Sequence, residues 1–335
     1  MKKLHFIYTP TTGVGLHGGY RGDNWFRGRV EIFKKYTLKS LLNQKNKDFI
    51  HWFSFRDEEQ YSQIVDDLRK YLTSIKYPFV FTFDGLMYHD DKFTNFTFKT
   101  CLRNLLMMVW DCWRYKQLSN PFRILRYAFE NKNKTLLSRL TWSLGDLKRF
   151  WKGEPWIYLT RIDSDDMFHR DAVELIQEVE PKEKRAITIQ NGYVLNHTTG
   201  QLADWNPPTN PPFHTIIFPA DSFFNVKLHK EYYGKYRSHE SIPHVFECIQ
   251  IPDKNYCYAI HGNNISTYWN TDKLFMVSAS NKTNISTRWH LNKLRVWWLK
   301  RKNPQLKTIR EVHPFIGKEY TGEEKNRILK TFGII

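Results

Sequence analysis

The chain has 335 residues, of which 41% are hydrophobic and 16% aromatic. This apolar content is enough for a packed core and excludes a disordered chain, and the 16 Gly and 14 Pro are too few for a collagen-like or low-complexity protein. The 51 Lys and Arg outnumber the 34 Asp and Glu and give a formal net charge of +17, so this is a basic protein of enzyme size.

Apolar runs of strand length alternate with stretches of helical periodicity along most of the chain. Such alternation predicts an α/β fold. The segment from residue 191 to about 210 is rich in turn-forming residues, and a stiff loop over one edge of the sheet is predicted at Pro207, Pro208, Pro211 and Pro212. In chain order, strands are predicted at residues 4–8, 49–55, 79–83, 156–162 and 186–190, and helices at 29–43, 58–75 and 169–179.

Two segments carry the excess positive charge. Residues 92–153 contain 13 basic and three acidic residues, a net charge of +10, and residues 288–310 contain eight basic residues and no acid. The first has helical periodicity and is predicted to be a helical insertion, and residues 269–335 are predicted to be a basic aromatic extension. Three interpretations stay open: solvated faces of ordinary helices, a surface that meets anionic lipid headgroups, or nucleic-acid binding.

The sequence also bears on the cellular compartment. No run of about 18 apolar residues could cross a membrane, and the first apolar run, residues 4–8, is too short for the core of a signal peptide. The four cysteines form no C-x-x-C pair and are expected to be reduced. A cytoplasmic protein is therefore expected, attached peripherally to the inner membrane face if the basic segments bind lipid.

Three carboxylates, Asp163, Asp165 and Asp166, follow the apolar run at residues 158–162. They would stand at the carboxyl end of a strand, where α/β proteins bind ligands. Carboxylates this close repel one another unless a cation joins them, and Mg²⁺ and Mn²⁺ take carboxylates together with phosphate oxygens. The structural alternative is a cap on the helix predicted from residue 169. Since one Asp is enough for a cap, the cluster favours a metal site.

The D-x-D triplet belongs to a longer resemblance. The string LTRIDSDD at residues 159–166 resembles the T-R-L-D-N-D-D string of a rhamnosyltransferase family with the GT-A fold. Similar strings occur in the same order and spacing, although FPAD at residues 218–221 departs from the family pattern on the acceptor side. The resemblance covers residues 1–90 and 155–268 and neither basic segment. The other matching strings are WFRGR at 25–29, FIHW at 49–52, QNGY at 190–193, PF at 212–213 and HGNNIS at 261–266.

The resemblance implies a fold and an activity. Residues 1–268 would form a GT-A (nucleotide-diphospho-sugar transferase) domain, with a mixed sheet flanked by helices. Its activity would be transfer of a sugar, such as rhamnose or another hexose, from a nucleotide-diphosphate donor to a glycan or a lipid-linked glycan. A metal-dependent phosphoesterase, which could also use an aspartate cluster, is the rival enzyme class. The high positive charge leaves a non-catalytic nucleic-acid-binding protein as a second rival.

The resemblance also implies a metal centre. Asp165, with Asp163 or Asp166, would hold Mn²⁺ or Mg²⁺ on the donor diphosphate and so neutralise charge as the sugar leaves. His261 is the candidate for a further ligand from a distant part of the chain. The alternative for His261 is a structural role, which is common for a single His after a strand.

Other residues are candidates for contact with the donor. Asp84, at the end of a predicted strand, could hydrogen-bond the base or ribose, or could simply form a turn with Gly85. Arg29 and Arg161 could contact the phosphates or the nucleotide, and Asp163 could contribute to the same surface. The alternative for both arginines is an ion pair at the surface.

A glycosyltransferase of this kind also needs a general base that takes a proton from the acceptor hydroxyl. Three residues in the later half of the domain could serve: His239, Glu240 and Asp221. Spacing after the D-x-D triplet favours the neighbouring pair of His239 and Glu240. A solvated loop would explain the same residues equally well.

Overall fold

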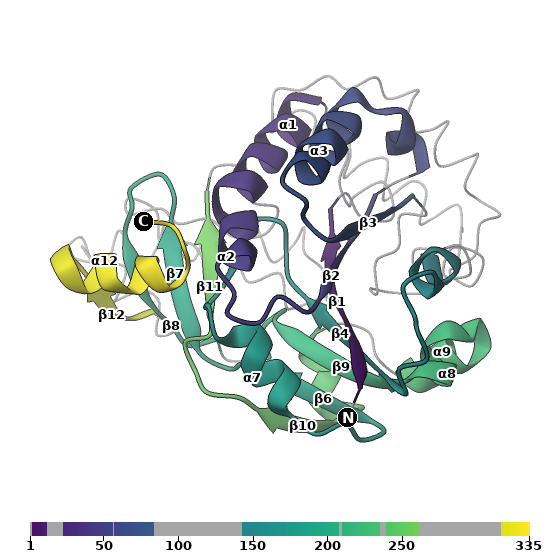
Figure 1. The fold of residues 1–335 in the computed structure, drawn as a ribbon. Coiled ribbons are helices and arrows are strands. Elements are labelled where there is room, and N and C mark those ends of the chain that lie inside the picture. Colours follow the sequence, from purple (N-terminus) through teal and green to yellow (C-terminus); the bar gives the residue numbers. More distant parts are fainter. Residues whose placement is uncertain are drawn as a thin grey trace, which may run out of the picture.

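The computed structural model describes residues 2–11, 23–55, 57–83, 143–207, 210–234, 239–261 and 316–335. Its centre is a seven-stranded mixed sheet with the strand order β10-β6-β9-β4-β1-β2-β3 (Figure 1). Strands β1 to β4 are parallel, whereas β9 runs antiparallel to β4 and β6. The predicted α/β class with a mixed sheet is therefore confirmed. The strands are β1 (Lys3–Pro10), β2 (Ile50–Ser54), β3 (Phe79–Thr82), β4 (Trp156–Arg161), β6 (Arg185–Thr188), β9 (His214–Pro219) and β10 (Glu247–Gln250).

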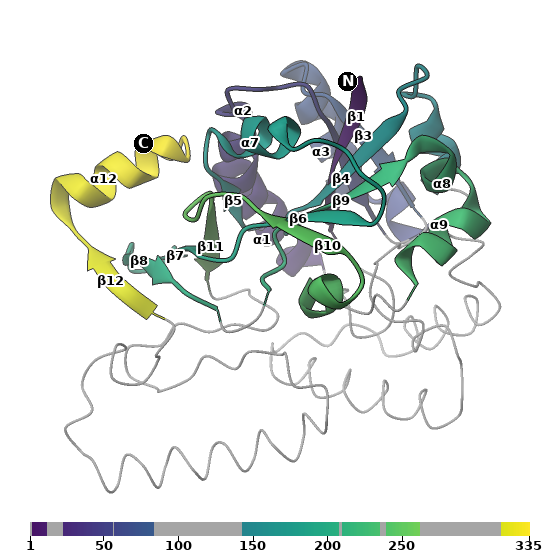
Figure 2. The ribbon, with the colours of Figure 1, turned by 90° about the horizontal axis from the view of Figure 1, so that it is seen from below.

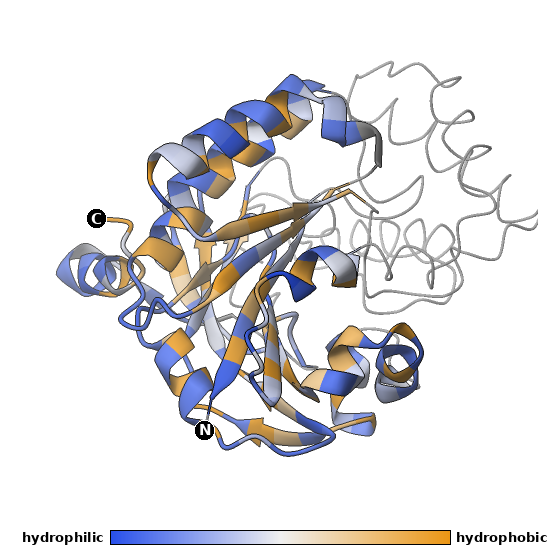
Figure 3. Ribbon diagram, turned by 45° about the vertical axis from the view of Figure 1, so that its right-hand side comes forward, coloured by the Kyte–Doolittle hydropathy of each residue, from blue (hydrophilic) through white to orange (hydrophobic). Residues whose placement is uncertain are grey.

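Helices cover both faces of this sheet. One face packs against α1, α2, α3 and α7, and the other against helical residues 143–148, α8, α9 and η4. Apolar residues gather in the strands and along the helix sides that face them (Figure 3). The helical elements around this sheet are α1 (Asp23–Ile32), a π-helical turn η1 (Phe33–Thr37), α2 (Leu38–Leu42), η2 (Asp57–Tyr61), α3 (Gln63–Ser74), α7 (Ala172–Glu178), α8 (Ala220–Phe224), α9 (Val226–Tyr233) and η4 (His239–His244).

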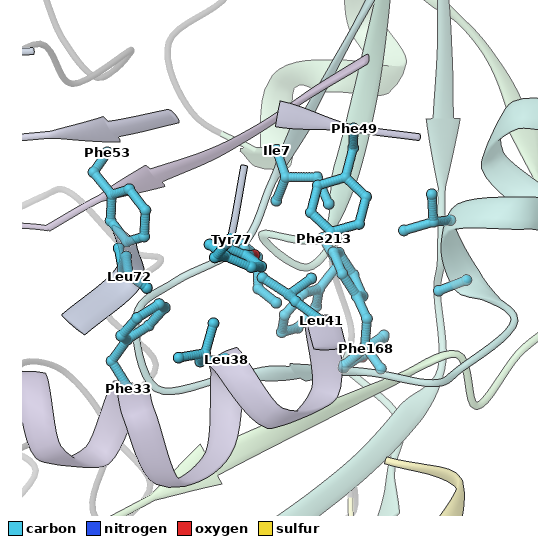
Figure 4. Packing of buried hydrophobic residues seen from close by; sticks show 14 of the residues in the cluster. Ile7, Phe33, Leu38, Leu41, Phe49, Phe53, Leu72, Tyr77, Phe168 and Phe213 are labelled. Carbon is cyan, nitrogen blue, oxygen red and sulfur yellow. The ribbon is translucent and has the colours of Figure 1, made fainter. Parts of the chain in front are cut away.

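The first helical segment shows how the core fixes the layers. Phe33, Leu38 and Leu41 point from η1 and α2 toward the sheet, where Phe53 and Phe49 lie (Figure 4). All five side chains are at most 5% exposed. The helix begins six residues earlier than predicted, so that it includes Asp23 in its first turn, where an acid favours the helix dipole.

Polar side chains within the sheet are paired with one another. His5 Nε2 lies 2.7 Å from Thr160 Oγ1, and His51 Nε2 lies 2.8 Å from Thr9 Oγ1. The other ring nitrogen of His51 lies 3.0 Å from the Tyr77 hydroxyl. Burial lowers the pKa of both histidines to about 3, so both rings are neutral at pH 7.

A second, five-stranded sheet lies beside the first, in the order β12-β8-β7-β11-β5 (Figure 2). No strand was predicted in the turn-rich segment from 191 to about 210, yet β7 and β8 lie in it. Turn-forming residues around a tight connection, where Gly200 has φ +72°, hide two short strands from a sequence pattern. The strands are β5 (Met167–Phe168), β7 (Gly192–Asn196), β8 (Leu202–Trp205), β11 (Tyr256–Ile260) and β12 (Ile316–Tyr320).

The last residues of the chain complete this second sheet. Strand β12 pairs antiparallel with β8, and α12 (Gly322–Thr331) leads to Phe332, which is fully buried. The predicted extension otherwise falls on residues 269–315, outside the described part of the chain, so the domain boundary stays a prediction. Residues 92–142 of the predicted insertion also lie outside it, while residues 143–148 are helical. No helix of the described residues is long and apolar enough to span a membrane.

Gly192, at the start of β7, has no room for a side chain. A Cβ there would lie 2.6 Å from ring carbons of Tyr256 and 2.7 Å from its carbonyl oxygen. Tyr256 is fully buried and stacks on Phe213 at 3.9 Å between ring centroids. We expect Gly192→Ala to lower the free energy of unfolding by about 1–3 kcal/mol in urea denaturation. Gly145→Ala is the control: it lies in a helix with nothing within 4 Å and should gain about 0.5–1 kcal/mol. Equal midpoints for the two variants would contradict this account.

Candidate functional site

The aspartate cluster lies where the two sheets meet. Strand β4 of the first sheet ends at Arg161, and the chain enters β5 of the second sheet at Met167. The backbone N–H of Ile162 donates to the carbonyl of Tyr8 at 3.0 Å, and a turn closes through the N–H of Asp166 and the carbonyl of Asp163 at 3.2 Å. The predicted carboxylates therefore stand on one short loop, residues 162–166, at the carboxyl end of β4. We call this the β4–β5 loop.

Asp165 is buried and forms an ion pair with Arg29 of α1. Nη1 of Arg29 lies 2.6 Å from Oδ2 of Asp165, and Nη2 lies 3.1 Å from Oδ1. Nη2 also donates to Oγ of Ser164 at 2.8 Å. The side chains of Arg29 and Asp165 are 8% and 7% exposed, so the pair is largely shielded from water. Arg29 is thus held against the β4–β5 loop rather than open to a phosphate.

His261 is the third member of this cluster. It directly follows β11, and its Nε2 lies 2.9 Å from Oδ2 of Asp165 and 3.2 Å from Nη1 of Arg29. Burial opposes ionisation of Asp165, but the charge of Arg29 and the hydrogen bonds from His261 and Arg29 hold the pKa of that carboxyl well below its usual range. Asp165 is therefore an ionised carboxylate in a nearly dry environment.

His197 is a member of the site that the sequence did not predict. Its ring stacks on Tyr36 at 3.5 Å between centroids and on His261 at 5.7 Å. Burial and the nearby His261 lower the pKa of His197 to about 3, so the ring is neutral. The sequence does hold a pattern that points to His197. Asn196 at the end of β7 pairs in parallel with Ile260 at the end of β11, and a histidine follows each of them. This pattern can be recognised only if β7 is known to be a strand, and the sequence analysis does not predict a strand there.

Asp166 ties the β4–β5 loop to β11 through a hydrogen bond. Its Oδ1 accepts a hydrogen bond from the backbone N–H of Ala259 at 2.8 Å, and its Oδ2 is buried without a hydrogen bond to the described residues. Burial, followed by repulsion from Asp165 and Asp163, raises the pKa of Asp166 well above its usual range.

Asp163 is the most exposed acid of the β4–β5 loop, at 31% for its side chain. Its Oδ1 accepts from Nη2 of Arg161 at 3.0 Å and from Nε at 3.2 Å. Beside Arg161 lies His214, whose pKa is lowered well below its usual value by burial, with the charges of Arg161 and His239 acting in the same direction. Arg161 therefore links the β4–β5 loop to the start of β9.

The structure separates the three candidates for a general base. His239 and Glu240 begin η4, where the carbonyl of His239 accepts from Nδ2 of Asn210 at 2.9 Å, and they belong to the end of the sheet that carries Arg161. Oε1 of Glu240 is buried and makes no hydrogen bond to the described residues. Asp221 instead follows the far end of the antiparallel strand β9, where Ala220 N–H donates to the Pro155 carbonyl before β4. Asp221 is thus at the opposite end from the β4–β5 loop, and Asp84 lies outside the described residues.

The contacts of the four predicted metal ligands show how well the described residues fit a divalent cation. No group of three His, Cys, Asp or Glu side chains in the described part of the chain is arranged to hold an ion. Of the four, Asp165 and His261 touch through their side chains, and Arg29 contacts both oxygens of Asp165. Arg161 takes Oδ1 of Asp163. Arginines therefore occupy both oxygens of Asp165 and one of Asp163, an arrangement that does not fit a resident Mn²⁺ or Mg²⁺ at Asp165.

Comparison with known proteins gives distant structural likenesses. No family model and no curated protein matches the chain. It is similar to the inositol-1-phosphate CTP transferase from T. maritima, at 11% identity and a TM-score of 0.30, over 88% of this chain and 95% of that one. It is also similar to a putative nucleotide-diphospho-sugar transferase from Desulfovibrio desulfuricans G20, at 10% identity and a TM-score of 0.26, over 89% and 96%. Likenesses of this size carry no argument about what the chain binds.

Proposed function

We propose that this protein is a glycosyltransferase that moves a sugar, rhamnose or another hexose, from a nucleotide-diphosphate donor to a glycan or lipid-linked glycan. One observation supports it most. Three strings of the family resemblance, WFRGR, LTRIDSDD and HGNNIS, supply Arg29, Asp165 and His261, which form one buried cluster. These residues lie 136 and 96 positions apart along the chain, so their contact is independent of the order and spacing on which the resemblance rests.

The described residues suit a displacement at the sugar's anomeric carbon. Glu240 would take the proton of the acceptor hydroxyl, whose oxygen then bonds to the anomeric carbon. The bond from that carbon to the diphosphate breaks, and its electron pair leaves with the nucleotide diphosphate. Arg161, at the same end of the sheet, would attract the departing phosphates. The partly exposed carboxylate of Asp163 would accept a hydrogen bond from the donor's ribose.

Two further parts of the expectation rest on the sequence alone. A divalent cation on the donor diphosphate is the chemistry that the resemblance implies, but the described side chains do not fit it, and no step above depends on it. Attachment to anionic lipid concerns residues 92–153 and 288–310, of which the structure describes residues 143–153, and it stays a prediction. No described contact favours a phosphoesterase or a nucleic-acid-binding protein over the transferase.

The experiment measures release of nucleotide diphosphate from a panel of nucleotide sugars, including dTDP-rhamnose and UDP-hexoses. We expect turnover of at least one donor. Glu240→Gln should lower kcat by about 100-fold or more, because the amide cannot accept the proton, while donor affinity is kept. Glu247→Gln is the matched control, since Glu247 lies on the surface in ion pairs with Lys182 and Arg185. Absence of binding and turnover across the panel would refute the transferase; full activity of Glu240→Gln would refute only the base.

A further inference from the structure

We propose that Arg29 is the built-in counter-ion of the β4–β5 loop, so that the protein binds its nucleotide donor without a divalent cation. The identity of the donor rests on the proposed function. The inference itself rests on the geometry around Asp165. Both oxygens of this carboxylate contact one guanidinium, at 2.6 and 3.1 Å, and Oδ2 also lies 2.9 Å from Nε2 of His261.

Arg29 is held in place by the core. On α1 its neighbours Trp25, Phe26 and Val30 are at most 5% exposed and pack into the main apolar cluster. The guanidinium carbon lies 5.7 Å from the Trp25 ring centroid, a distance at which a cation is attracted to the ring face. Ser164 fixes the second terminal nitrogen. Turning the guanidinium away from Asp165 would therefore break several buried contacts at once.

A metal ion at Asp165 would have to displace this arrangement. Mg²⁺ needs carboxylate oxygens at about 2.0–2.1 Å, yet the oxygens of Asp165 are occupied by the contacts described above. A divalent ion placed beside the guanidinium would be repelled by it. Since the side chains of Arg29, Asp165 and His261 are all less than a tenth exposed, water screens that repulsion weakly.

The same pairing extends along the β4–β5 loop. Arg161 contacts Oδ1 of Asp163, whereas Arg29 contacts both oxygens of Asp165, so each of these two carboxylates has a guanidinium beside it. A cluster neutralised in this way does not repel a diphosphate. Neutralising the charge of Asp163 and Asp165, which a divalent ion does for bare carboxylates, is done here by arginines of this chain.

The test combines a measurement with Mn²⁺ alone and one with nucleotide. The electron paramagnetic resonance signal of free Mn²⁺ should keep its amplitude when the full-length protein is added. Arg29→Met, which leaves Asp165 without its guanidinium, should reduce that signal. Arg185→Met, which removes an arginine from a surface ion pair with Glu247, should not. Stoichiometric loss of the Mn²⁺ signal with the unaltered protein would overturn the proposal, whether or not Arg29→Met folds.

Nucleotide binding separates this proposal from the function on which it rests. UDP and dTDP should raise the thermal midpoint of the unaltered protein equally in excess EDTA and in excess Mn²⁺, since a ligand that binds the native state stabilises it. A shift that appears only with Mn²⁺ would overturn the built-in counter-ion and leave the transferase standing. No shift in either buffer would count against the transferase, and the Mn²⁺ measurement would still decide the role of Arg29.

Discussion

Arg29→Met is expected to lower the free energy of unfolding by about 3–5 kcal/mol, because removing one partner of a buried ion pair leaves the other charge uncompensated. The charge left behind is Asp165, 7% exposed, with His261 as its remaining partner. Methionine keeps much of the arginine's length and can fill the apolar part of the site, so most of the loss reflects charge rather than packing. Urea denaturation followed by circular dichroism measures the change.

Two further variants identify the origin of that loss. Lys45→Met removes an ion pair with Asp171 that is also short, at 2.8 Å, but the Lys45 side chain is 51% exposed, and the expected cost is about 0–1 kcal/mol. The double variant Arg29→Met with Asp165→Asn removes both charges and should recover part of the stability. If Arg29→Met cost no more than Lys45→Met, Asp165 would not be the buried anion described above.

The sequence predicts those strands and helices whose pattern of apolar residues lies within a single segment of the chain. The apolar runs of β1, β2 and β4 are long enough to be read as strands, and the carboxylates after β4 stand at a strand end, as expected. The β7 and β8 strands were missed because each is only four or five residues long and is bordered by turn-forming residues. Short strands are stabilised by their neighbours in the sheet, and those neighbours are distant in the chain.

The candidate site shows the same limit more sharply. An arginine at position 29 and an aspartate at position 165 are each visible in the sequence, but nothing in their spacing says that they pair. Asp221 lies later in the chain than the aspartate cluster, and antiparallel β9 places it at the end of the sheet opposite the β4–β5 loop. Candidate functional residues can therefore be identified from the sequence more easily than their positions in the fold. The direction of each strand determines which of these residues come into contact.

Acidification should destabilise the protein well before its carboxylates titrate. His5 and His51 are fully buried, with pKa values of about 3 in the folded state against 6.5 when exposed, and His229 is lowered to about 4. Below pH 6.5 these histidines bind protons in the unfolded chain but stay neutral in the folded protein. Stability is therefore lost as pH falls through 6.5 toward the folded pKa. By pH 5 each of His5 and His51 should cost about 2 kcal/mol relative to pH 8.

His51→Gln tests the cause of this pH dependence. The amide can still bond to Thr9 and Tyr77, the two partners of the His51 ring, but it does not titrate. The plot of unfolding free energy against pH should therefore lose about 1.2 kcal/mol per pH unit of its slope between pH 6 and 5. His244→Gln is the control, because His244 is exposed on η4 and stays in water in both states. An unchanged slope in His51→Gln would mean that this ring takes up a proton in the folded protein, and the neutral hydrogen-bonded pair with Thr9 would have to be abandoned.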